Sequence, residues 1–542
     1  MSMRFLACAV LTIAALMAET PAESNSAVRR LLDQVAGQER AFARSLQRYS
    51  PVVETYLQDM EEGAEGLSTG DHYFLGKLDF QGGLGYTSLT ARTKSQKTFL
   101  SLLFKRHAAL FHPQGFAQMI FPDAADFDRD HYEFEYVRRE FLGEVRCYVF
   151  DVKPANKASG KFVGRIWVED SGNHIVRFNG TYTDSRPSHL YFHFDSWRTN
   201  VVSGEWLPSY IYIEENSLPG KKGESGFKGQ TRLWGYKPVS NNRLDELTSI
   251  LVDGNSGVKD QAAAADASPL ESQRAWERQA EENVLDRLER SGLLAPKGGV
   301  DAVLNTVVNN LLATSNLNLD IDCRVLLTTP LETFSLPHTI VISRGLVDVL
   351  PDEGSLAMVL ANELAQIALG YTTQTRYAFH DEIMFADEDT LQRFRFQRSE
   401  QEMATAGRKA MEILEASPYR EKLGGAVLFL RALNARVGRL PNLIQANLGN
   451  QLGAGGNLAR LETVVKNAPP LKEESLTQIA ALPLGSRVKM DPYASELALV
   501  KAKPVALLSA REKMPFEVTP FMPYLVRLAQ MTGITHQAQG GR

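Results

Sequence analysis

The chain has 542 residues, of which 44% are hydrophobic and 23% charged, and its formal net charge is −5. This composition is ordinary for a globular protein of about two to four domains, each long enough to enclose a core. The small negative charge does not indicate binding to nucleic acid or to an anionic membrane surface, so no nucleic acid partner is expected.

The first residues are typical of a secretory signal peptide. Arg4 precedes an uncharged apolar run over 5–18, and small residues suited to cleavage stand at Ala18 and Ala22. The run is too short to span a bilayer. We therefore expect residues 1–22 to be removed and the protein to be exported, either periplasmic or secreted, with no transmembrane helix after cleavage.

Two cysteines remain after this cleavage, Cys147 and Cys323, and they fall in different predicted domains. Export permits a disulfide between them, but this separation favours two buried thiols. A metal site built from cysteines is excluded, because such a site needs more thiolates than the chain offers.

The pattern then changes from helical to extended. Residues 27–66 are expected to form a helical lead-in, and residues 71–252 a β-rich domain in which apolar and polar residues alternate. Two apolar runs at 162–169 and 174–182 flank Asp170-Ser171-Gly172-Asn173, which predicts a hairpin. A curved antiparallel sheet is the expected result.

The hairpin strands, residues 164–169 and 175–180, resemble those of LolA-like domains, the half-barrels of outer-membrane lipoprotein carriers. This resemblance rests on the strand pattern. It implies a sheet with a face suited to a lipid, an acyl chain or an apolar peptide. The alternative is a β-rich packing domain that binds no ligand.

Three further segments complete the predicted organisation. Residues 253–267 are rich in Gly, Asn, Asp and Ala and are expected to be a linker. A second domain at 268–450 begins with a helix that Ser268, Pro269 and Glu271 would start. A small C-terminal unit is expected at 471–530, with a Pro-rich apolar stretch that packs on the body or meets a partner.

The most informative segment is 359–370, Val-Leu-Ala-Asn-Glu-Leu-Ala-Gln-Ile-Ala-Leu-Gly. In the motif H-E-x-x-H, two histidines on one face of a helix bind Zn²⁺, and the glutamate between them is the general base. This chain keeps Glu363 at the position of the base. Asn362 and Gln366 stand at the two histidine positions.

The surroundings of this helix resemble the CAAX-endopeptidase-like zinc metallopeptidases (HtpX and BepA type, peptidase family M-forty-eight). The matching residues are Phe334, Pro337, Arg344, Gly345, Leu346, Val359, Leu360, Ala361 and Glu363. The resemblance implies a mostly α zincin-like (gluzincin) domain, and so an α+β multidomain protein. The family's third zinc ligand, a glutamate, corresponds to Gln401, or to Glu400 if the register shifts by one residue.

The resemblance therefore implies a degenerate metal site at Asn362, Gln366 and Gln401. Neutral amides are poor zinc ligands, and without the metal nothing lowers the pKa of an attacking water. We expect no cofactor, and a pseudopeptidase that binds a polypeptide or an envelope protein. Glu363 would then cap the helix or pair with Arg344 or Arg398.

Two alternatives stay open. His338 and His380, together with Glu363 or Glu400, could restore a zinc site and give an active metalloendopeptidase. Alternatively, the β-rich domain could act as a lipid or lipoprotein carrier, with the zincin-like domain as its scaffold. For a peptidase-like cleft, the expected lining residues are Phe334, Pro337, His338, Arg344 and Glu400.

Overall fold

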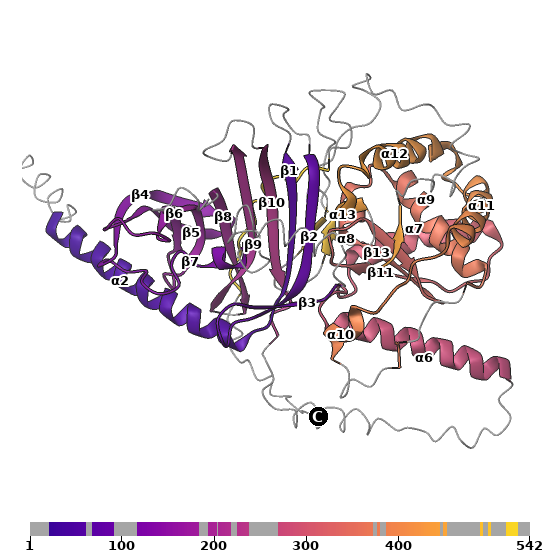
Figure 1. The fold of residues 1–542 in the computed structure, drawn as a ribbon, viewed down its shortest axis with the longest axis horizontal. Coiled ribbons are helices and arrows are strands. Elements are labelled where there is room, and N and C mark those ends of the chain that lie inside the picture. Colours follow the sequence, from indigo (N-terminus) through magenta and orange to yellow (C-terminus); the bar gives the residue numbers. More distant parts are fainter. Residues whose placement is uncertain are drawn as a thin grey trace, which may run out of the picture.

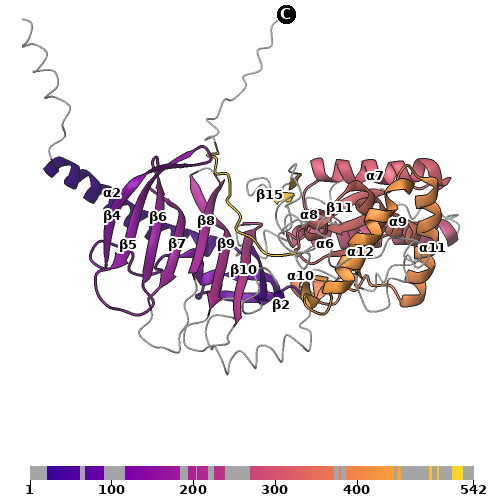
Figure 2. The same ribbon diagram turned by 90° about the horizontal axis from the view of Figure 1, so that it is seen from above.

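The computed structural model describes residues 21–60, 68–90, 116–183, 193–202, 204–217, 225–237, 269–371, 377–379, 386–444, 448–452, 488–490, 497–499 and 516–528. A large antiparallel sheet comes first and a mostly helical part follows, which confirms the expected α+β multidomain class (Figures 1 and 2). The predicted signal peptide apart from its last two residues, the linker at 253–267 and most of 471–530 lie outside the described residues.

The first described element is a long amphipathic helix, α2 (Pro21–Ser45), which continues into the short 3₁₀ helix η2 (Leu46–Arg48). Its buried residues recur every three or four positions and form one stripe: Leu32, Val35, Ala36, Glu39 and Phe42. Figure 1 shows α2 running along one side of the sheet. The stripe therefore faces the strands.

Ten strands form one antiparallel sheet in the order β3-β2-β1-β10-β9-β8-β7-β6-β5-β4. The first three strands thus join the sheet beside the last one. The strands are β1 (Val52–Met60), β2 (Ser68–Asp79), β3 (Gly85–Ser88), β4 (Tyr132–Leu142), β5 (Val145–Pro154), β6 (Phe162–Glu169), β7 (Ile175–Tyr182), β8 (His193–Val202), β9 (Glu205–Ser217) and β10 (Ser225–Trp234).

The helical lead-in expected at 27–66 differs from the structure, because its second half contains β1. This strand lies between β2 and β10 and is buried on both faces. A strand that is buried on both faces has no polar side to reveal a period of two, although Val, Thr and Tyr favour extended backbone. The helical pattern holds as far as Arg48.

The hairpin predicted around Asp170-Ser171-Gly172-Asn173 is confirmed, with β6 and β7 as its antiparallel strands. The carboxylate of Glu169 accepts hydrogen bonds from the backbone N–H groups of Ser171 (2.9 Å) and Gly172 (2.6 Å). Asn173 adopts a left-handed conformation with φ 62°, which asparagine tolerates better than most residues.

The two faces of the sheet contribute to two different apolar cores. One core lies between the sheet and α2 and includes Phe42, Leu57, Phe162, Phe178, Phe194 and Ile211. The other includes Tyr56, Trp167, Trp197 and Trp234, and it continues into the helical part through Leu293, Leu294 and Leu346. The second core thus joins the two parts of the chain.

The helical part contains a four-stranded sheet in the order β11-β13-β12-β14, in which β11 and β13 are parallel. Its strands are β11 (Asp322–Leu326), β12 (Glu332–Ser335), β13 (Thr339–Ser343) and β14 (Asn450–Gln451). Its helices are α6 (Pro269–Arg290), α7 (Gly299–Ser315), α8 (Arg344–Val349), α9 (Glu353–Ala368), α10 (Asp387–Leu391), α11 (Glu400–Ala416), α12 (Leu423–Arg436) and α13 (Pro441–Ile444).

A buried carboxylate of β1, that of Glu54, connects the two parts. It accepts hydrogen bonds from the backbone N–H (2.6 Å) and the hydroxyl (2.8 Å) of Thr329, and Arg344 Nη2 lies 3.7 Å from it. Burial raises the pKa of Glu54, and Arg232 and these hydrogen bonds oppose the rise. A Cβ at Gly345 would lie 1.8 Å from the carbonyl oxygen of Thr329, so only glycine fits beside this contact.

A second carboxylate, that of Asp71 on β2, reinforces the same junction. It accepts hydrogen bonds from the backbone N–H groups of Asn442 (2.9 Å) and Leu443 (2.7 Å) at the start of α13. Lys77 on the same strand pairs with Glu388 of α10 at 2.7 Å. The junction therefore combines a shared apolar core with satisfied buried polar groups, which makes the relative position of the two parts specific.

The segment 516–528 packs back on the large sheet, as expected for the Pro-rich C-terminal stretch. Gln58 on β1 donates to the carbonyl of Phe516 (2.7 Å) and accepts from the N–H of Val518 (2.9 Å). Farther along, Arg527 Nη2 lies 2.7 Å from the carboxylate of Glu169. The two short strands β15 (Val488–Met490) and β16 (Leu497–Leu499) pair antiparallel.

Cys147 and Cys323 are free thiols, each completely buried. This agrees with the interpretation that favoured buried thiols over a disulfide. Among the described residues, no helix has the length and apolar character that a membrane span requires.

Candidate functional site

The centre of the helical part is α9, which carries the degenerate motif. Asp352 caps it, because its side chain accepts a hydrogen bond from the N–H of Ser355 at 2.7 Å. All three motif residues are buried: Glu363 and Gln366 are 0% exposed and Asn362 is 6% exposed. The helix therefore presents this polar face to other parts of the protein rather than to solvent.

The carboxylate of Glu363 is held by two neighbouring strands. Thr333 Oγ1 on β12 donates to Glu363 Oε1 at 2.7 Å. Asn450 Nδ2 on β14 lies 3.2 Å from Oε1 and 3.3 Å from Oε2. Both oxygens of the position that would act as a general base are thus engaged within the fold.

Gln366 lies one turn farther along and completes the network. Its Oε1 accepts from Asn450 Nδ2 (3.2 Å), Arg398 Nε (3.3 Å) and Ser335 Oγ (3.4 Å). Burial lowers the pKa of Arg398, and the nearby Glu363 carboxylate raises it in opposition. A guanidinium group therefore supplies positive charge beside this face of α9.

The third degenerate position, Gln401, is not brought to α9 by any contact among the described residues. Gln401 and Glu400 both lie exposed in the first turn of α11. Ser399 and Glu402 form a capping box at this end of the helix. The residue that contacts Gln366 is instead Arg398, which lies just before α11 and donates a hydrogen bond to the Gln366 side chain.

The side chains around α9 do not fit a zinc ion. Zinc is bound in proteins by histidine, thiolate or carboxylate, whereas here the two flanking positions are neutral amides and the one carboxylate already accepts hydrogen bonds from Thr333 and Asn450. Among the described residues, both polar side-chain atoms of Asn362 and the Nε2 of Gln366 are buried without a partner. Those described residues also contain no group of three or more His, Cys, Asp or Glu placed to hold a metal ion.

Two other residues that were predicted to line the cleft, Phe334 and Arg344, are buried within the fold. Phe334 is buried and stacks on Phe396, with ring centroids 4.4 Å apart and an interplanar angle of 13°. Arg344 is buried at the junction with β1, where it donates to Thr329 Oγ1 at 2.9 Å. The suggested pairing of Glu363 with Arg344 is therefore wrong, whereas the alternative partner Arg398 lies close to Glu363.

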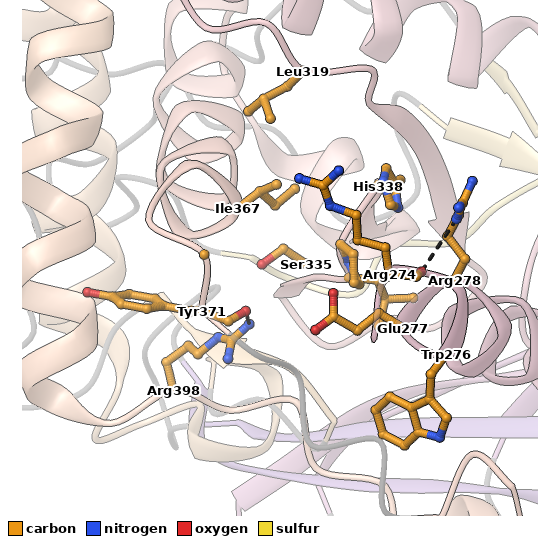
Figure 3. A pocket seen from close by; sticks show the side chains of 13 residues that line it. Arg274, Trp276, Glu277, Arg278, Leu319, Ser335, His338, Ile367, Tyr371 and Arg398 are labelled. Carbon is orange, nitrogen blue, oxygen red and sulfur yellow. Dashed lines mark hydrogen bonds between the residues drawn. The ribbon is translucent and has the colours of Figure 1, made fainter. Parts of the chain in front are cut away.

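A cavity of about 680 Å³ opens between α6 and the end of α9, and we call it the α6–α9 cavity. Figure 3 shows Arg274, Trp276 and Arg278 of α6 on one side of this cavity and Tyr371 and Arg398 on the other. Its remaining lining residues are Glu277, Leu319, Ser335, Leu336, Pro337, His338, Ile367 and Gly370.

His338 and Pro337, both predicted to line a peptidase-like cleft, line the α6–α9 cavity. His338 Nδ1 is 3.0 Å from Glu281 Oε2 on α6, so a buried carboxylate orients the ring. The other histidine considered for a rescued site, His380, lies outside the described residues. Trp276 of α6 is 52% exposed and stacks on Phe379.

A second, smaller cavity of about 310 Å³ lies where α2 covers the large sheet. Its apolar lining comes from Phe42, Trp206 and Leu207, and its charged lining consists of Arg198, Arg48 and Glu205, of which Arg48 and Glu205 pair with each other at 2.7 Å. We call it the α2 cavity.

The α2 cavity adjoins a buried ion pair. Arg198 Nη1 and Nη2 lie 2.6 and 2.9 Å from the two carboxylate oxygens of Glu39, and its guanidinium carbon lies 3.8 Å from the ring centroid of Phe42. Arg198 Nε is buried without a partner among the described residues. A cation is therefore held at the boundary between helix and sheet.

Comparison with known proteins gives two findings. No protein-family model and no curated protein matches the sequence. Several solved structures are similar to part of it, among them the following two. One is a LolA-superfamily protein of Nitrosomonas europaea, with 12% identity and a TM-score of 0.20, covering 38% of this chain and 95% of that chain.

The other is a putative outer membrane lipoprotein-sorting protein domain from Vibrio parahaemolyticus, with 10% identity and a TM-score of 0.21, covering 40% of this chain and 97% of that chain. The two names belong to the lipoprotein-carrier class with which residues 164–169 and 175–180 were compared.

Proposed function

We propose that the N-terminal part of this protein is a carrier that binds an acyl chain of a lipid or lipoprotein between α2 and the large sheet. The observation that carries this proposal is the α2 cavity, which joins an apolar lining to a held cation. Such a ligand needs an apolar surface for its acyl chain and a cation for its anionic or polar head group.

The core beneath α2 supplies the apolar surface that such a ligand would use. Phe162, Phe178 and Phe194 contact one another with centroids 5.7 to 6.2 Å apart, and Phe42 of α2 belongs to the same core. Because the described core is already filled by side chains, a long acyl chain enters only if α2 moves away from the sheet.

The attachments of α2 are of a kind that permits such movement. Besides its apolar stripe, α2 is held by Glu39–Arg198 and by Asp33, whose carboxylate accepts from Arg129 Nε at 2.7 Å and from Arg129 Nη2 at 2.8 Å. A buried ion pair contributes little net stability compared with apolar packing, since desolvation offsets its Coulomb energy. These contacts determine where α2 docks on the sheet. They add little to the free energy that is needed to move α2 away from the sheet.

The test is binding of a fluorescent palmitate analogue to the full chain. Ala41 is an exposed residue of α2 that lines the α2 cavity, and Ala27 is an exposed residue of α2 away from it. We expect Ala41→Trp to weaken binding about tenfold or more by filling the cavity, and Ala27→Trp to leave it unchanged. Equal binding by both variants, or none by the natural chain, would contradict the proposal.

We also propose that the helical part binds polypeptide without hydrolysing it. Its support is the engagement of both Glu363 oxygens by Thr333 and Asn450, together with the α6–α9 cavity beside the same helix. With both carboxylate oxygens engaged, and with no group of metal ligands near it among the described residues, Glu363 is not placed to activate water.

This second proposal is tested with casein and a chelator. We expect no cleavage by the natural chain and no change in Glu363→Gln. Cleavage that a chelator abolishes, and that Glu363→Gln also removes, would establish the alternative of an active metalloendopeptidase.

A further inference from the structure

We infer that the α6–α9 cavity recognises an acidic segment of a polypeptide, with carboxylate side chains on the segment paired to arginines on the two sides of the cavity. This inference refines the polypeptide binding proposed for the helical part and rests on it. It assigns a ligand class to a cavity that lies beside the polar face of α9.

The charges of the lining favour an anion. Three arginines, Arg274, Arg278 and Arg398, line the cavity against one glutamate, Glu277. The carboxylate of Glu277 already accepts a hydrogen bond from Gln273 at 3.1 Å. In the described part of the chain, neither Arg274 nor Arg278 forms an ion pair with a carboxylate, and both side chains are exposed.

The arginines stand on opposite sides, as Figure 3 shows. Arg274 and Arg278 are one helical turn apart on α6, where the Nε of Arg278 donates to the carbonyl of Arg274 at 3.4 Å. Arg398 lies across the cavity, oriented by Gln366 Oε1 at 3.3 Å and by the carbonyl of Tyr371 at 3.2 Å. An extended chain with two carboxylates can therefore pair with arginines that come from both sides.

The uncharged lining suits the remainder of a peptide. Leu319, Leu336, Pro337 and Ile367 provide an apolar surface, and Trp276 presents a half-exposed ring that stacks on Phe379. The volume of about 680 Å³ lies within the usual range for ligand sites. A lipid carries its charge at one end only, so arginines on both sides fit a peptide better than a single acyl chain.

Guanidinium groups are suited to this recognition, because their planar N–H groups match the two oxygens of a carboxylate. His338 adds a further N–H donor or acceptor at the same cavity, with its ring held by Glu281 at 3.0 Å. Arg398 and His338 are therefore held by the fold, which reduces the ordering cost of binding at this side of the cavity.

The test compares two rhodamine-labelled hexapeptides, acetylated and amidated, that differ only in carrying two glutamates or two glutamines. Fluorescence anisotropy measures their binding to the full chain and to two double variants. Arg274→Gln with Arg278→Gln alters the cavity. Arg408→Gln with Arg420→Gln, both exposed and away from the cavity, makes the same change in net charge.

We expect the glutamate peptide to bind the natural chain about tenfold or more tightly than the glutamine peptide. That preference should disappear in the Arg274/Arg278 variant and persist in the Arg408/Arg420 variant. Equal binding of both peptides to the natural chain would overturn acidic recognition but leave polypeptide binding intact.

Binding of neither peptide would overturn both the inference and the proposed polypeptide binding. A final arm uses vesicles containing phosphatidylglycerol. Sedimentation with these vesicles that depends on Arg274 and Arg278, without any preference between the peptides, would show that the cavity serves an anionic lipid and would overturn the inference.

Discussion

Asn450 Nδ2 lies 3.2 Å from Oε1 of Glu363, on the polar face of α9, and the two residues are separated by 87 positions in the sequence. The same amide group lies 3.2 Å from Gln366 Oε1. A single side chain of β14 therefore occupies the position between the two motif residues. Glu363 is therefore part of a buried hydrogen-bonded network that joins α9 to β12 and β14.

The first prediction concerns the contribution of this contact to stability. Asn450→Ala leaves a buried carboxylate with fewer donors, and we expect it to lower the free energy of unfolding by about 2 kcal/mol, as for other hydrogen bonds to charged groups. Asn450→Asp should cost more, because it places a second carboxylate beside Glu363. Adding Glu363→Gln should recover most of that extra cost. Urea denaturation of the four proteins measures these differences, and an unchanged midpoint in Asn450→Ala would refute the assignment.

The second prediction concerns metal. We expect elemental analysis of the natural chain to find far less than one zinc per chain. Introducing ligands by Asn362→His, Gln366→His and Gln401→Glu should give little zinc uptake, because Arg398 places its charge 3.3 Å from the Gln366 side chain and Gln401 faces solvent. Adding Arg398→Ala to the triple variant should increase uptake. Stoichiometric zinc in the natural chain would invalidate the degenerate-site interpretation.

The third prediction concerns the ion pair between α2 and the sheet. Glu39→Leu alone leaves Arg198 buried without its carboxylate partner and should lower the free energy of unfolding by about 3–5 kcal/mol. Glu39→Leu combined with Arg198→Met should leave the free energy of unfolding nearly unchanged. Thermal and chemical denaturation of the single and double variants give the comparison. If the double variant is as unstable as the single one, the ion pair itself supplies net stability and does not serve mainly to position α2.

The fourth prediction concerns the attachment of residues 516–528. Burial would raise the pKa of Glu169, but hydrogen bonds from His174, Arg527 and the turn backbone outweigh it and lower the pKa to about 2 from the ordinary 4.5. The ionised Glu169 carboxylate therefore stabilises the attachment of residues 516–528 fully above pH 4.5. This stabilisation is lost as the pH falls from 4.5 towards 2 and the carboxylate is protonated.

Hydrogen exchange at Leu528, whose N–H donates to Asn200 Oδ1 at 2.9 Å, reports on this attachment. We expect protection to decrease across that pH window in the natural chain. Glu169→Gln should be weakly protected already at neutral pH and show little further change. A loss of protection that coincides with unfolding of the whole protein would contradict a local release.

The fifth prediction concerns the thiols. Burial raises the pKa of both Cys147 and Cys323 to about 12, so neither is a thiolate near neutral pH, and thiolate is the reactive form. For the chain without residues 1–22, which contain Cys8, we expect no reaction with Ellman's reagent in the folded protein at pH about 8 and two thiols per chain after denaturation. One accessible thiol in the folded state would show that its surroundings open.

The sequence was informative wherever the determining contacts are local. Asp170-Ser171-Gly172-Asn173 predicts its own turn, because Asn173 lies within it and Glu169, whose carboxylate accepts the hydrogen bonds, directly precedes it. The partners of Glu363 could not be predicted in this way. Thr333 and Asn450 come from separate strands, and only the β12–β14 pairing brings them together.

The third ligand position shows the same limit. Matching Phe396 and Arg398 to a family pattern indicated Gln401 as the residue that faces α9, whereas the structure places Arg398 there and leaves Gln401 exposed. A register match identifies a helix, but the orientation of its first turn depends on how the preceding loop packs. In the same way, the sequence pattern did not reveal β1 as a strand, because the residues that bury it come from two other parts of the chain.

The position of β1 also determines when this protein can fold. The residues of β10 that pair with β1 lie about 170 residues later in the sequence. The hydroxyl that donates to Glu54 belongs to Thr329, and the hydrogen-bond partners of Gln58 are Phe516 and Val518. Contacts so distant in sequence close slowly, because each requires a long loop to be ordered first. The emerging chain thus cannot complete the contacts of β1 until nearly all of it has been made. Such a delay keeps a polypeptide unfolded, which is the state in which it can be threaded through a narrow translocation channel.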